Sequence, residues 1–441
     1  MITSDTELES GIVSATEKLF ESKAAGRFVL TNAECHFGYC WEKVFRQWNM
    51  TATRWELDLE TKQLIMLPGP TNIPTRVANA MLRPIINHRG PEFRELHSRI
   101  IDNAKYVFGT KNDLFVLTAS GTGGVECAVR NISSPGAKII VGVNGVFSQR
   151  FYESVNLLGG KGIEVPVEWG NAATVAQIEE VLKKNSPVTA VAIIYNETST
   201  GVTTPHLKEI GELCRKHGAL FLVDAISIQG GVPLPVDEWG VDICITGSQK
   251  CLMTPPGLAL ISVSPKGWEV IKKAPRSYYF DLQLCKQFWD EKKETPYTPA
   301  VTLFYALDEA LQMIREEGLE ARFKRHAICA DAMYAAVEAM GLELYARKEV
   351  RSNTVLAIKY PSGIDDKNFR GALNKKYRVV VAGGMGKTHG QLFRIGVMGS
   401  VSQFEILATA TAIESVLTEQ GHKLKPGEGV TAAREVFAKS S

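Results

Sequence analysis

The chain has 441 residues, of which 45% are hydrophobic and 22% are charged, and its formal net charge is +2. This length predicts two or three domains, and this composition is typical of a folded globular protein rather than a disordered or fibrous one. The 50 basic and 48 acidic residues form no long block of one sign, which argues against a nucleic-acid binder. The expected class of function is therefore chemistry on small molecules.

The N-terminal segment, residues 1–63, has no counterpart in the pattern that follows, and its role is open. It begins MITSDTELESGIVSATEKLF, which is acidic and polar and lacks the basic and apolar parts of a secretory signal. Cys35, His36 and Cys40 could ligate a metal, but no fourth ligand accompanies them in the sequence, so we expect no metal site.

The cysteines and the apolar runs indicate the compartment. The eight cysteines include no CxxC pair with metal or redox spacing, which favours reduced thiols. Apolar runs such as AVAIIY are far shorter than the roughly 20 residues that a membrane-spanning helix needs. We therefore expect a cytoplasmic protein with no membrane segment.

Between Leu114 and Val263, short apolar runs alternate with longer amphipathic stretches. Runs without polar alternation predict strands buried on both faces, and the stretch TPHLKEIGELCRKHG (204–218) has the spacing, the Pro and the Gly of a helix. This order predicts βαβ units and a mainly parallel sheet. The runs are LFVLTA (114–119), KIIVGV (138–143), AVAIIY (190–195), LFLVDA (220–225), DICITG (242–247) and LALISV (258–263).

After Pro299 the pattern changes to two long helical stretches, over 302–318 and 320–341. NTVLAIKY (353–360), a helical stretch over 365–377, RVVVAGG and LFRIGVMG then suggest a small α+β domain, closed by a C-terminal helix over 403–421. We expect a large domain over residues 64–308 and a small domain over 309–441.

Three polar or glycine-rich elements follow predicted strands. TASGTGGVECAVRNI (118–132) runs from a strand into a helix whose free N–H groups suit a phosphate, although such a turn is also common punctuation. Asp224 closes one buried strand, where it could equally cap a following helix. Lys250 lies just past another buried strand, although most lysines are simply exposed on the surface.

Together these elements supply the three groups that pyridoxal phosphate requires. The lysine binds the aldehyde covalently, the carboxylate pairs with the protonated ring nitrogen, and the helix N-terminus holds the phosphate. Because the carboxyl ends of parallel strands bind ligands in such folds, we expect the three groups to lie together.

Eight motifs, in the right order over roughly residues 64–425, resemble the class V (fold type I) aminotransferases. The alanine–glyoxylate and serine–glyoxylate (serine–pyruvate) members are the most similar. The resemblance implies an α/β fold in which a large domain, with a mainly parallel sheet of the seven-stranded type, binds pyridoxal phosphate and a smaller C-terminal α+β domain follows. The motifs are LPGPTNIP (67–74), NHRGPEF (87–93), SGTGGVE (120–126), NETSTGV (196–202), VDAIS (223–227), GSQKCL (247–252), TPYTPAVTLFYAL (295–307) and FRIGVMG (393–399).

The resemblance also implies a role for individual residues. Lys250 and Asp224 would be catalytic: Lys250 holds the cofactor and then moves a proton, and Asp224 keeps the ring nitrogen protonated. Phe147 would stack on the ring, unless it is a core residue, and Thr198 would bond the cofactor O3′. The expected phosphate contacts are Thr122, Gly123, Gly124, Gln249 and, from the partner subunit of a homodimer with shared active sites, Thr298 with Tyr297 and Thr295 in an uncertain register.

For the substrate, the resemblance implies that Arg394 binds the α-carboxylate as a bidentate partner. The backbone at Gly69 would flank the same group. His88 and Arg89 would approach the pocket of the other subunit, although a structural role for them is equally open.

The implied reaction is a two-step amino transfer from serine or alanine to a 2-oxo acid such as glyoxylate or pyruvate. FRIGVMG and KLKPGEG (423–429) also resemble pyridoxamine–pyruvate transaminases, so an unusual amine donor stays open. A cysteine desulfurase would need a thiol over the substrate, for which Cys251 is the only obvious candidate. A dinucleotide-binding dehydrogenase should show G-x-G-x-x-G, which SGTGGVEC does not fit, and a catalytically dead relative should have lost the lysine or the aspartate.

Overall fold

The computed structural model describes residues 63–440, which belong to one unit by their contacts. Cys35, His36 and Cys40, and with them the question of a metal site there, lie outside the described residues. Within residues 63–440 no helix is both long enough and apolar enough to cross a membrane.

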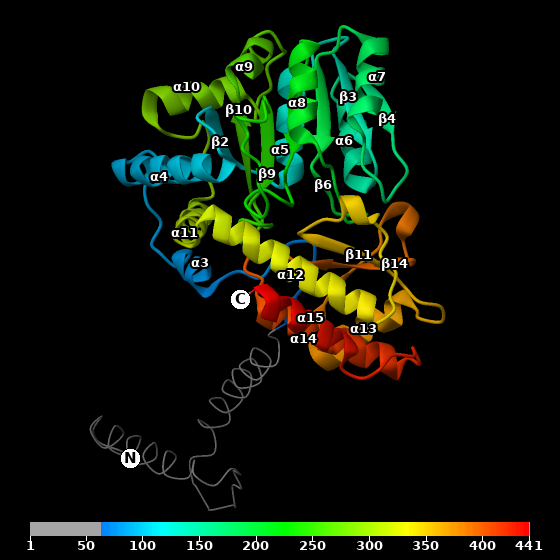
Figure 1. The fold of residues 1–441 in the computed structure, drawn as a ribbon. Helices are drawn as coiled ribbons and strands as arrows, with labels where there is room; N and C mark the ends of the chain where they lie inside the picture. The colour runs from blue at the N-terminus through cyan, green and yellow to red at the C-terminus, as the bar shows by residue number, and fades with distance from the viewer. Residues whose placement is uncertain (1–62, 441) are drawn as a thin grey trace, which may run out of the picture. The chain divides into compact units, whose positions relative to one another are not determined.

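A seven-stranded sheet is the centre of the first part of the chain (Figure 1). All neighbouring strands are parallel except β10, which is antiparallel to both β2 and β9. The mainly parallel α/β sheet is thereby confirmed. In spatial order the strands are β2 (Asp113–Thr118), β10 (Leu258–Val263), β9 (Ile243–Gly247), β8 (Leu220–Asp224), β5 (Ala190–Ile194), β3 (Lys138–Val143) and β4 (Lys161–Pro166).

Helices cover both faces of this sheet, which explains why its inner strands are continuous apolar runs. In β8, for example, Phe221 and Val223 belong to one apolar core and Leu220 and Leu222 to the other. The first core includes residues of α4 (Pro91–Phe108), α7 (Val175–Asn185), α8 (Leu207–Lys216) and α11 (Val301–Glu317). The second includes residues of α5 (Gly121–Ile132), α6 (Val146–Leu157), α9 (Pro265–Ile271) and α10 (Leu282–Lys292).

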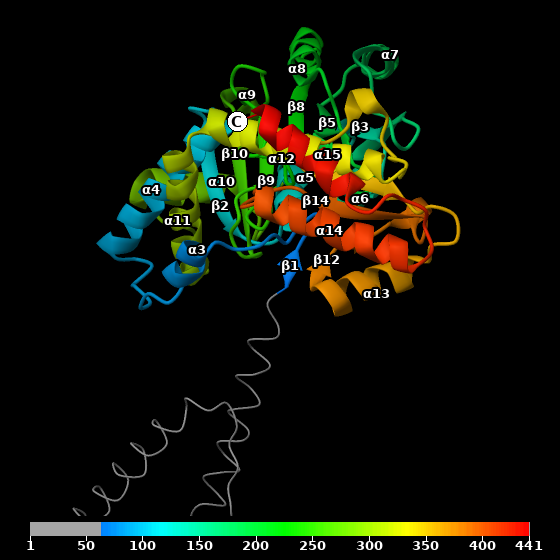
Figure 2. The ribbon, with the colours of Figure 1, turned by 60° about the horizontal axis from the view of Figure 1, so that its bottom comes forward.

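A third apolar core lies in the C-terminal part, around a three-stranded antiparallel sheet. Its strands are β11 (Val355–Lys359), β14 (Leu392–Gly396) and β13 (Ala382–Gly383), in this order. The core also takes residues of α12 (Leu319–Ala339), α13 (Asp366–Tyr377), α14 (Gln403–Glu419) and α15 (Glu428–Ser440). Figure 2 shows α12, α14 and α15 lying together outside the small sheet. The helix α15 follows the one expected to close the domain, so that part of the prediction was wrong.

The predicted large domain, residues 64–308, differs at both ends from the part of the chain that packs in the first core. β1 (Leu64–Ile65) pairs with β12 (Val379–Val380), and Met66 is buried in the C-terminal core. At the other end, side chains of α11 as far as Ile314 pack in the first core, beyond residue 308. The remaining short elements are α3 (Thr75–Ala80), the hairpin β6 (Asn196–Glu197) and β7 (Val202–Thr203), and the 3₁₀ turns Lys348–Val350 and Gly386–Thr388.

Candidate active site

The carboxyl ends of the sheet strands surround a pocket of about 120 Å³. The residues that line it follow β2, β3, β5, β8 and β9, so the fold brings them to one edge from distant positions. Six of the predicted cofactor residues are among them: Thr122, Phe147, Thr198, Asp224, Gln249 and Lys250.

Lys250 lies in the turn after β9, with its side chain against Pro68 and Gly69. Its Nζ donates a hydrogen bond to the carbonyl oxygen of Pro68. Gly69 has φ +92, and a Cβ there would lie 2.3 Å from Lys250 Cδ, so only glycine leaves room for the lysine. Burial, and then the positive charge of Arg394, lower the pKa of Lys250 to about 8. Part of the amine is therefore neutral and nucleophilic near neutral pH.

Asp224 is the last residue of β8, and it is buried. Its Oδ1 accepts a hydrogen bond from the backbone N–H of Ile226 at 2.9 Å. The chain then turns and reaches β9 with no helix between, so the alternative of a helix cap is wrong. Burial raises the pKa of Asp224 to about 7, which means that its ionised form needs a cationic partner in the pocket.

The N-terminus of α5 supplies the donors of the pocket. Ser120 caps the helix, since its side chain accepts from the N–H of Gly123 at 3.3 Å and its carbonyl oxygen accepts from the N–H of Gly124 at 3.1 Å. Among the described residues the N–H groups of Gly121 and Thr122 have no partner, so these two, rather than those of Gly123 and Gly124, are available to an anion. Gly124 instead allows close packing on the sheet, because its Cβ would lie 2.9 Å from Ile245 Cγ2.

Gln249 adds an unused polar group to the pocket. Its Oε1 is buried and has no hydrogen-bond partner among the described residues. A buried amide oxygen without a partner is uncommon in folded proteins, and a ligand that presents a hydrogen-bond donor would satisfy it.

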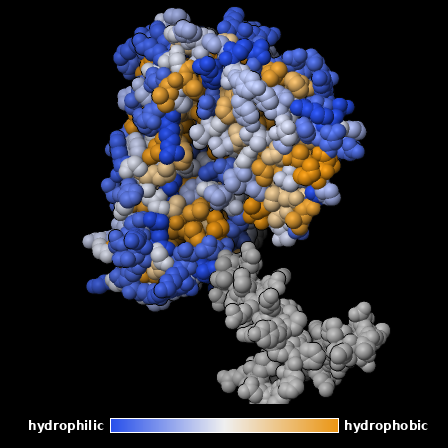
Figure 3. Space-filling view, turned by 180° about the vertical axis from the view of Figure 1, so that it is seen from behind, coloured by the Kyte–Doolittle hydropathy of each residue, from blue (hydrophilic) through white to orange (hydrophobic). Residues whose placement is uncertain are grey.

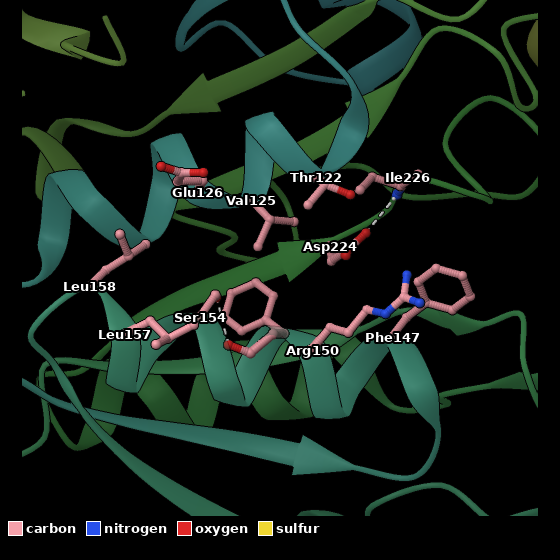
Figure 4. A pocket seen from close by; sticks show the side chains of 11 residues that line it. Thr122, Val125, Glu126, Phe147, Arg150, Ser154, Leu157, Leu158, Asp224 and Ile226 are labelled. Atoms are coloured by element: carbon pink, nitrogen blue, oxygen red, sulfur yellow. Dashed lines mark hydrogen bonds between the residues drawn. The ribbon is translucent and has the colours of Figure 1, made fainter. Parts of the chain in front are cut away.

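Phe147, the second residue of α6, lines the pocket and also an adjoining hollow of about 320 Å³ between α5 and α6 (Figure 4). Because its ring is half-buried and faces both hollows, the alternative of a core phenylalanine is wrong. The guanidinium carbon of Arg150 lies 5.4 Å from the centre of the ring.

Arg394 of β14 lies beside the pocket and is 7% exposed. Its Nε donates to the carbonyl oxygen of Gly383 at 2.9 Å, and its Nη1 donates to that of Thr198 at 3.1 Å. Among the described residues its Nη2 has no partner, which leaves N–H groups for a carboxylate. Burial lowers the pKa of Arg394 to about 10, so it stays charged at neutral pH.

The residues expected from the partner subunit lie apart from this pocket. Thr298 lines a separate hollow, where its Oγ1 is 3.5 Å from His88 Nε2. Arg89 pairs with Glu294 at 3.0 Å and donates to the carbonyl oxygen of Pro296 at 3.0 Å. Within one chain, then, Arg89 fixes the loop that carries Thr298 and does not reach the pocket of Lys250.

Sequence reasoning missed several residues of the pocket. Ser120, Gly121, Asn196 and Ser227 line it beside the predicted ones. All four were inside the quoted motifs SGTGGVE, NETSTGV and VDAIS, but only the structure shows which positions of a motif face the pocket.

Cys251, the residue after Lys250, does not face the pocket. It is 1% exposed and packs with Val355 and Met398, and burial raises the pKa of its thiol to about 11. A thiol that stays protonated inside a core cannot attack a substrate, which argues against the cysteine desulfurase alternative. Within residues 63–440 no cluster of His, Cys, Asp and Glu is arranged to hold a metal ion.

Comparison with known proteins identifies the family. The family model described as aminotransferase class V matches residues 68–404 of the chain. The chain belongs to the class V aminotransferases. An uncharacterized aminotransferase of Methanocaldococcus jannaschii is 47% identical to it over 86% of this chain and 98% of the relative.

Relatives with a stated activity cover the same part of this class V aminotransferase. A serine–glyoxylate aminotransferase of Methylorubrum extorquens is 37% identical over 84% of this chain and 94% of the relative. The crystal structure of a ureidoglycine–glyoxylate aminotransferase of Bacillus subtilis superposes with a TM-score of 0.83 and 32% identity, covering 86% of this chain and 98% of that one. The expected enzyme class and fold are therefore confirmed.

As a class V aminotransferase the chain uses pyridoxal phosphate, and the pocket fits this cofactor. Lys250 offers an amine with a lowered pKa, and Asp224 a carboxylate that needs a cationic partner. The free N–H groups of Gly121 and Thr122 suit the phosphate. The unpaired Oε1 of Gln249 is an acceptor, so a contact between Gln249 and the phosphate would have to come from its Nε2.

Proposed function

We propose that the chain transfers an amino group from a small amino acid, serine or alanine, to a 2-oxo acid, glyoxylate or pyruvate. The observation that carries the proposal is that Lys250, Asp224 and the N-terminus of α5 line one pocket and that Arg394 lies beside it. The first three groups suit the cofactor, and Arg394 suits the carboxylate of an acid substrate.

In this proposal each residue has a defined task. Pyridoxal phosphate, when bound, supplies the electron-withdrawing ring that the reaction requires. Nζ of Lys250 would hold the cofactor and, once the substrate amine has taken its place there, would move the proton of the substrate α-carbon. Asp224 holds the ring nitrogen in its protonated form, and Phe147 and Thr198 orient the ring. Arg394 orients the substrate through its carboxylate, with the backbone at Gly69 alongside.

The choice of amino donor has two candidates. The serine–glyoxylate relative favours a common small amino acid. The solved ureidoglycine–glyoxylate enzyme favours an unusual amine, as does the likeness of FRIGVMG to pyridoxamine–pyruvate transaminases. Both candidates share the acid substrate that Arg394 would bind.

We also propose a homodimer in which Thr298, His88 and Arg89 approach the partner's pocket. Large exposed apolar side chains support an interface, and Figure 3 shows hydrophobic patches on the face seen from behind. The large exposed apolar side chains include Leu82, Ile85, Tyr278 and Tyr279, of which the two tyrosines lie close to the loop of Thr298. A dimer by size-exclusion chromatography with light scattering is expected, and a fully active monomer would contradict it.

Two further proposals concern location and organisation. The cytoplasm is the proposed compartment, because the described cysteines are free and buried. The large and small domains are proposed to meet near Gly318, between α11 and α12, rather than at residue 308.

A panel of donors against glyoxylate and pyruvate tests the function. Serine, alanine, aspartate and pyridoxamine are each supplied with one acceptor, and the new amino acid is measured by mass spectrometry. Serine or alanine should give the highest kcat/KM, and turnover with none of the donors would contradict the proposal.

A further inference from the structure

Glu197 of β6 is a buried carboxylate that the proposed mechanism does not use. It is fully buried, and no Lys, Arg or His among the described residues forms an ion pair with it. Its Oε1 accepts from Ser199 Oγ at 2.6 Å and Ser199 N at 3.1 Å, and its Oε2 accepts from Ser148 N at 2.8 Å and Ser148 Oγ at 2.9 Å. These hydrogen bonds thus compensate for the bonds to water that the carboxylate loses on burial.

These bonds fasten the first turn of α6, the helix that carries Phe147. The backbone N–H of Phe147 donates to Glu197 Oε1 at 3.3 Å, and that of Val146 donates to Ser199 Oγ at 2.9 Å. The residue before the helix is Gly145, which cannot cap it with a side chain. Glu197 therefore caps the N-terminus of α6, although it is 50 positions from Phe147 in the sequence. The dipole of α6 favours a negative charge at this end of the helix.

The backbone at Gly145 packs closely against the side chains of Glu197 and Ser199. A Cβ on Gly145 would lie 2.4 Å from Glu197 Cδ and 2.5 Å from Ser199 Oγ. Hydrogen bonds on both oxygens and the close backbone therefore restrain the carboxylate. Phe147 N is one of the groups that donate to this carboxylate.

Glu197 is also linked to the groups on the other side of the pocket. The next residue, Thr198, lines the pocket, and its carbonyl oxygen accepts from Arg394 Nη1. The negative charge of Glu197 also raises the pKa of Arg394, against the effect of burial. The carboxylate of Glu197 thus accepts from the backbone of Phe147, and Glu197 is the neighbour in sequence of Thr198, which binds Arg394.

We infer that Glu197 is a positioning residue that sets the ring of Phe147 toward the cofactor and the guanidinium of Arg394 toward the substrate carboxylate. It touches neither ligand and acts through α6 and through Thr198. This inference rests on the proposed function.

Replacing Glu197 by Gln tests it, since the amide has the same size but turns N–H groups toward donors. At least one donor among Phe147 N, Ser148 N and the two serine hydroxyls then loses its acceptor. We expect Kd for pyridoxal phosphate to rise about tenfold, which corresponds to about 1.4 kcal/mol. The circular dichroism band of the bound cofactor should change, and KM for the amino acid should rise.

Asp242→Asn is the control for a general loss of stability, and Asp242 differs from Glu197 in that Lys266 Nζ lies 3.5 Å from its carboxylate. Asp242 is also buried and accepts from a backbone N–H, that of Phe221 at 2.9 Å, and from a serine hydroxyl, Ser264 Oγ at 2.6 Å. It precedes β9 and so lies at the amino end of the strands, opposite the pocket. D242N should lower the melting temperature and leave the cofactor band, Kd and KM unchanged.

Ser199→Ala is a milder variant that keeps the test decisive if E197Q does not fold. It removes one donor to Glu197 and the acceptor for Val146 N, and it should shift the same three quantities in the same direction by a smaller factor. Loss of melting temperature in E197Q and S199A, with the cofactor band, Kd and KM as in the wild type, would overturn the inference. A wild-type chain that binds no pyridoxal phosphate would instead overturn the proposed function.

Discussion

Truncation of Arg394 to alanine should separate substrate binding from cofactor binding. In the proposed function the carboxylate of the substrate meets the N–H groups that Gly383 and Thr198 do not occupy. A hydrogen bond to a charged group contributes about 1.5–3 kcal/mol, so the loss of two such bonds at the lower value is about 3 kcal/mol. This corresponds to a fall in kcat/KM of about 150-fold.

The assay compares kcat/KM of wild type, R394A and Arg394→Lys for serine or alanine. Lysine keeps the charge without the planar fork, so R394K should fall between the other two. The cofactor absorbance of R394A should persist, and its melting temperature reports the separate effect of leaving the carbonyl oxygens of Gly383 and Thr198 unpaired. An unchanged kcat/KM in R394A, or an equal loss for an amine donor without a carboxylate, would refute the reasoning.

Two further predictions concern Asp224 and Cys251. Because burial raises the pKa of Asp224 from 3.8 to about 7, the folded apo chain binds more protons than the unfolded one between these values, and its stability should fall by up to about 4 kcal/mol as pH rises through this range. Urea unfolding of the apo chain should show this slope in the wild type and not in Asp224→Asn, and equal slopes would contradict the assignment. Cys251→Ala should cost on the order of 1 kcal/mol of stability and keep the transaminase activity, because its thiol lies in a core. Release of sulfide from cysteine by the wild type, absent in C251A, would contradict this.

Helices and strands could be predicted wherever a single stretch of sequence shows the apolar pattern of the element. The strands β5, β8, β9 and β10 are buried along their length, and each is a continuous apolar run. The strand β4 lies at the edge of the sheet, and its exposed residues include Lys161, Glu164 and Pro166, so no apolar run marks it. The helix α15 buries only the small residues Gly429 and Ala433 completely, and the larger Val430, Val436 and Phe437 are only partly buried, so its apolar signal is weak.

The site divides in the same way. Asp224 and Lys250 stand out in the sequence because each interrupts or ends an apolar run beside a strand. Glu197 does not, because the donors that explain its burial include Phe147 and Ser148, about 50 positions away. Arg89 likewise could not be assigned, since its partner Glu294 is 205 positions along the chain. Such contacts depend on the packing of α6 and of the loop after α10, which no local pattern encodes.

The most direct test of the account is to reduce the complex of the purified chain and pyridoxal phosphate with borohydride and to map the labelled peptide by mass spectrometry. Reduction fixes the cofactor to the amine that holds it, so the label should lie on Lys250 alone. The Lys250→Ala variant should carry no label, and the wild type should lose its absorbance band when the amino donor is added before the borohydride. A label on another lysine, or an unlabelled wild type, would contradict the assignment of Lys250 and with it the proposed reaction.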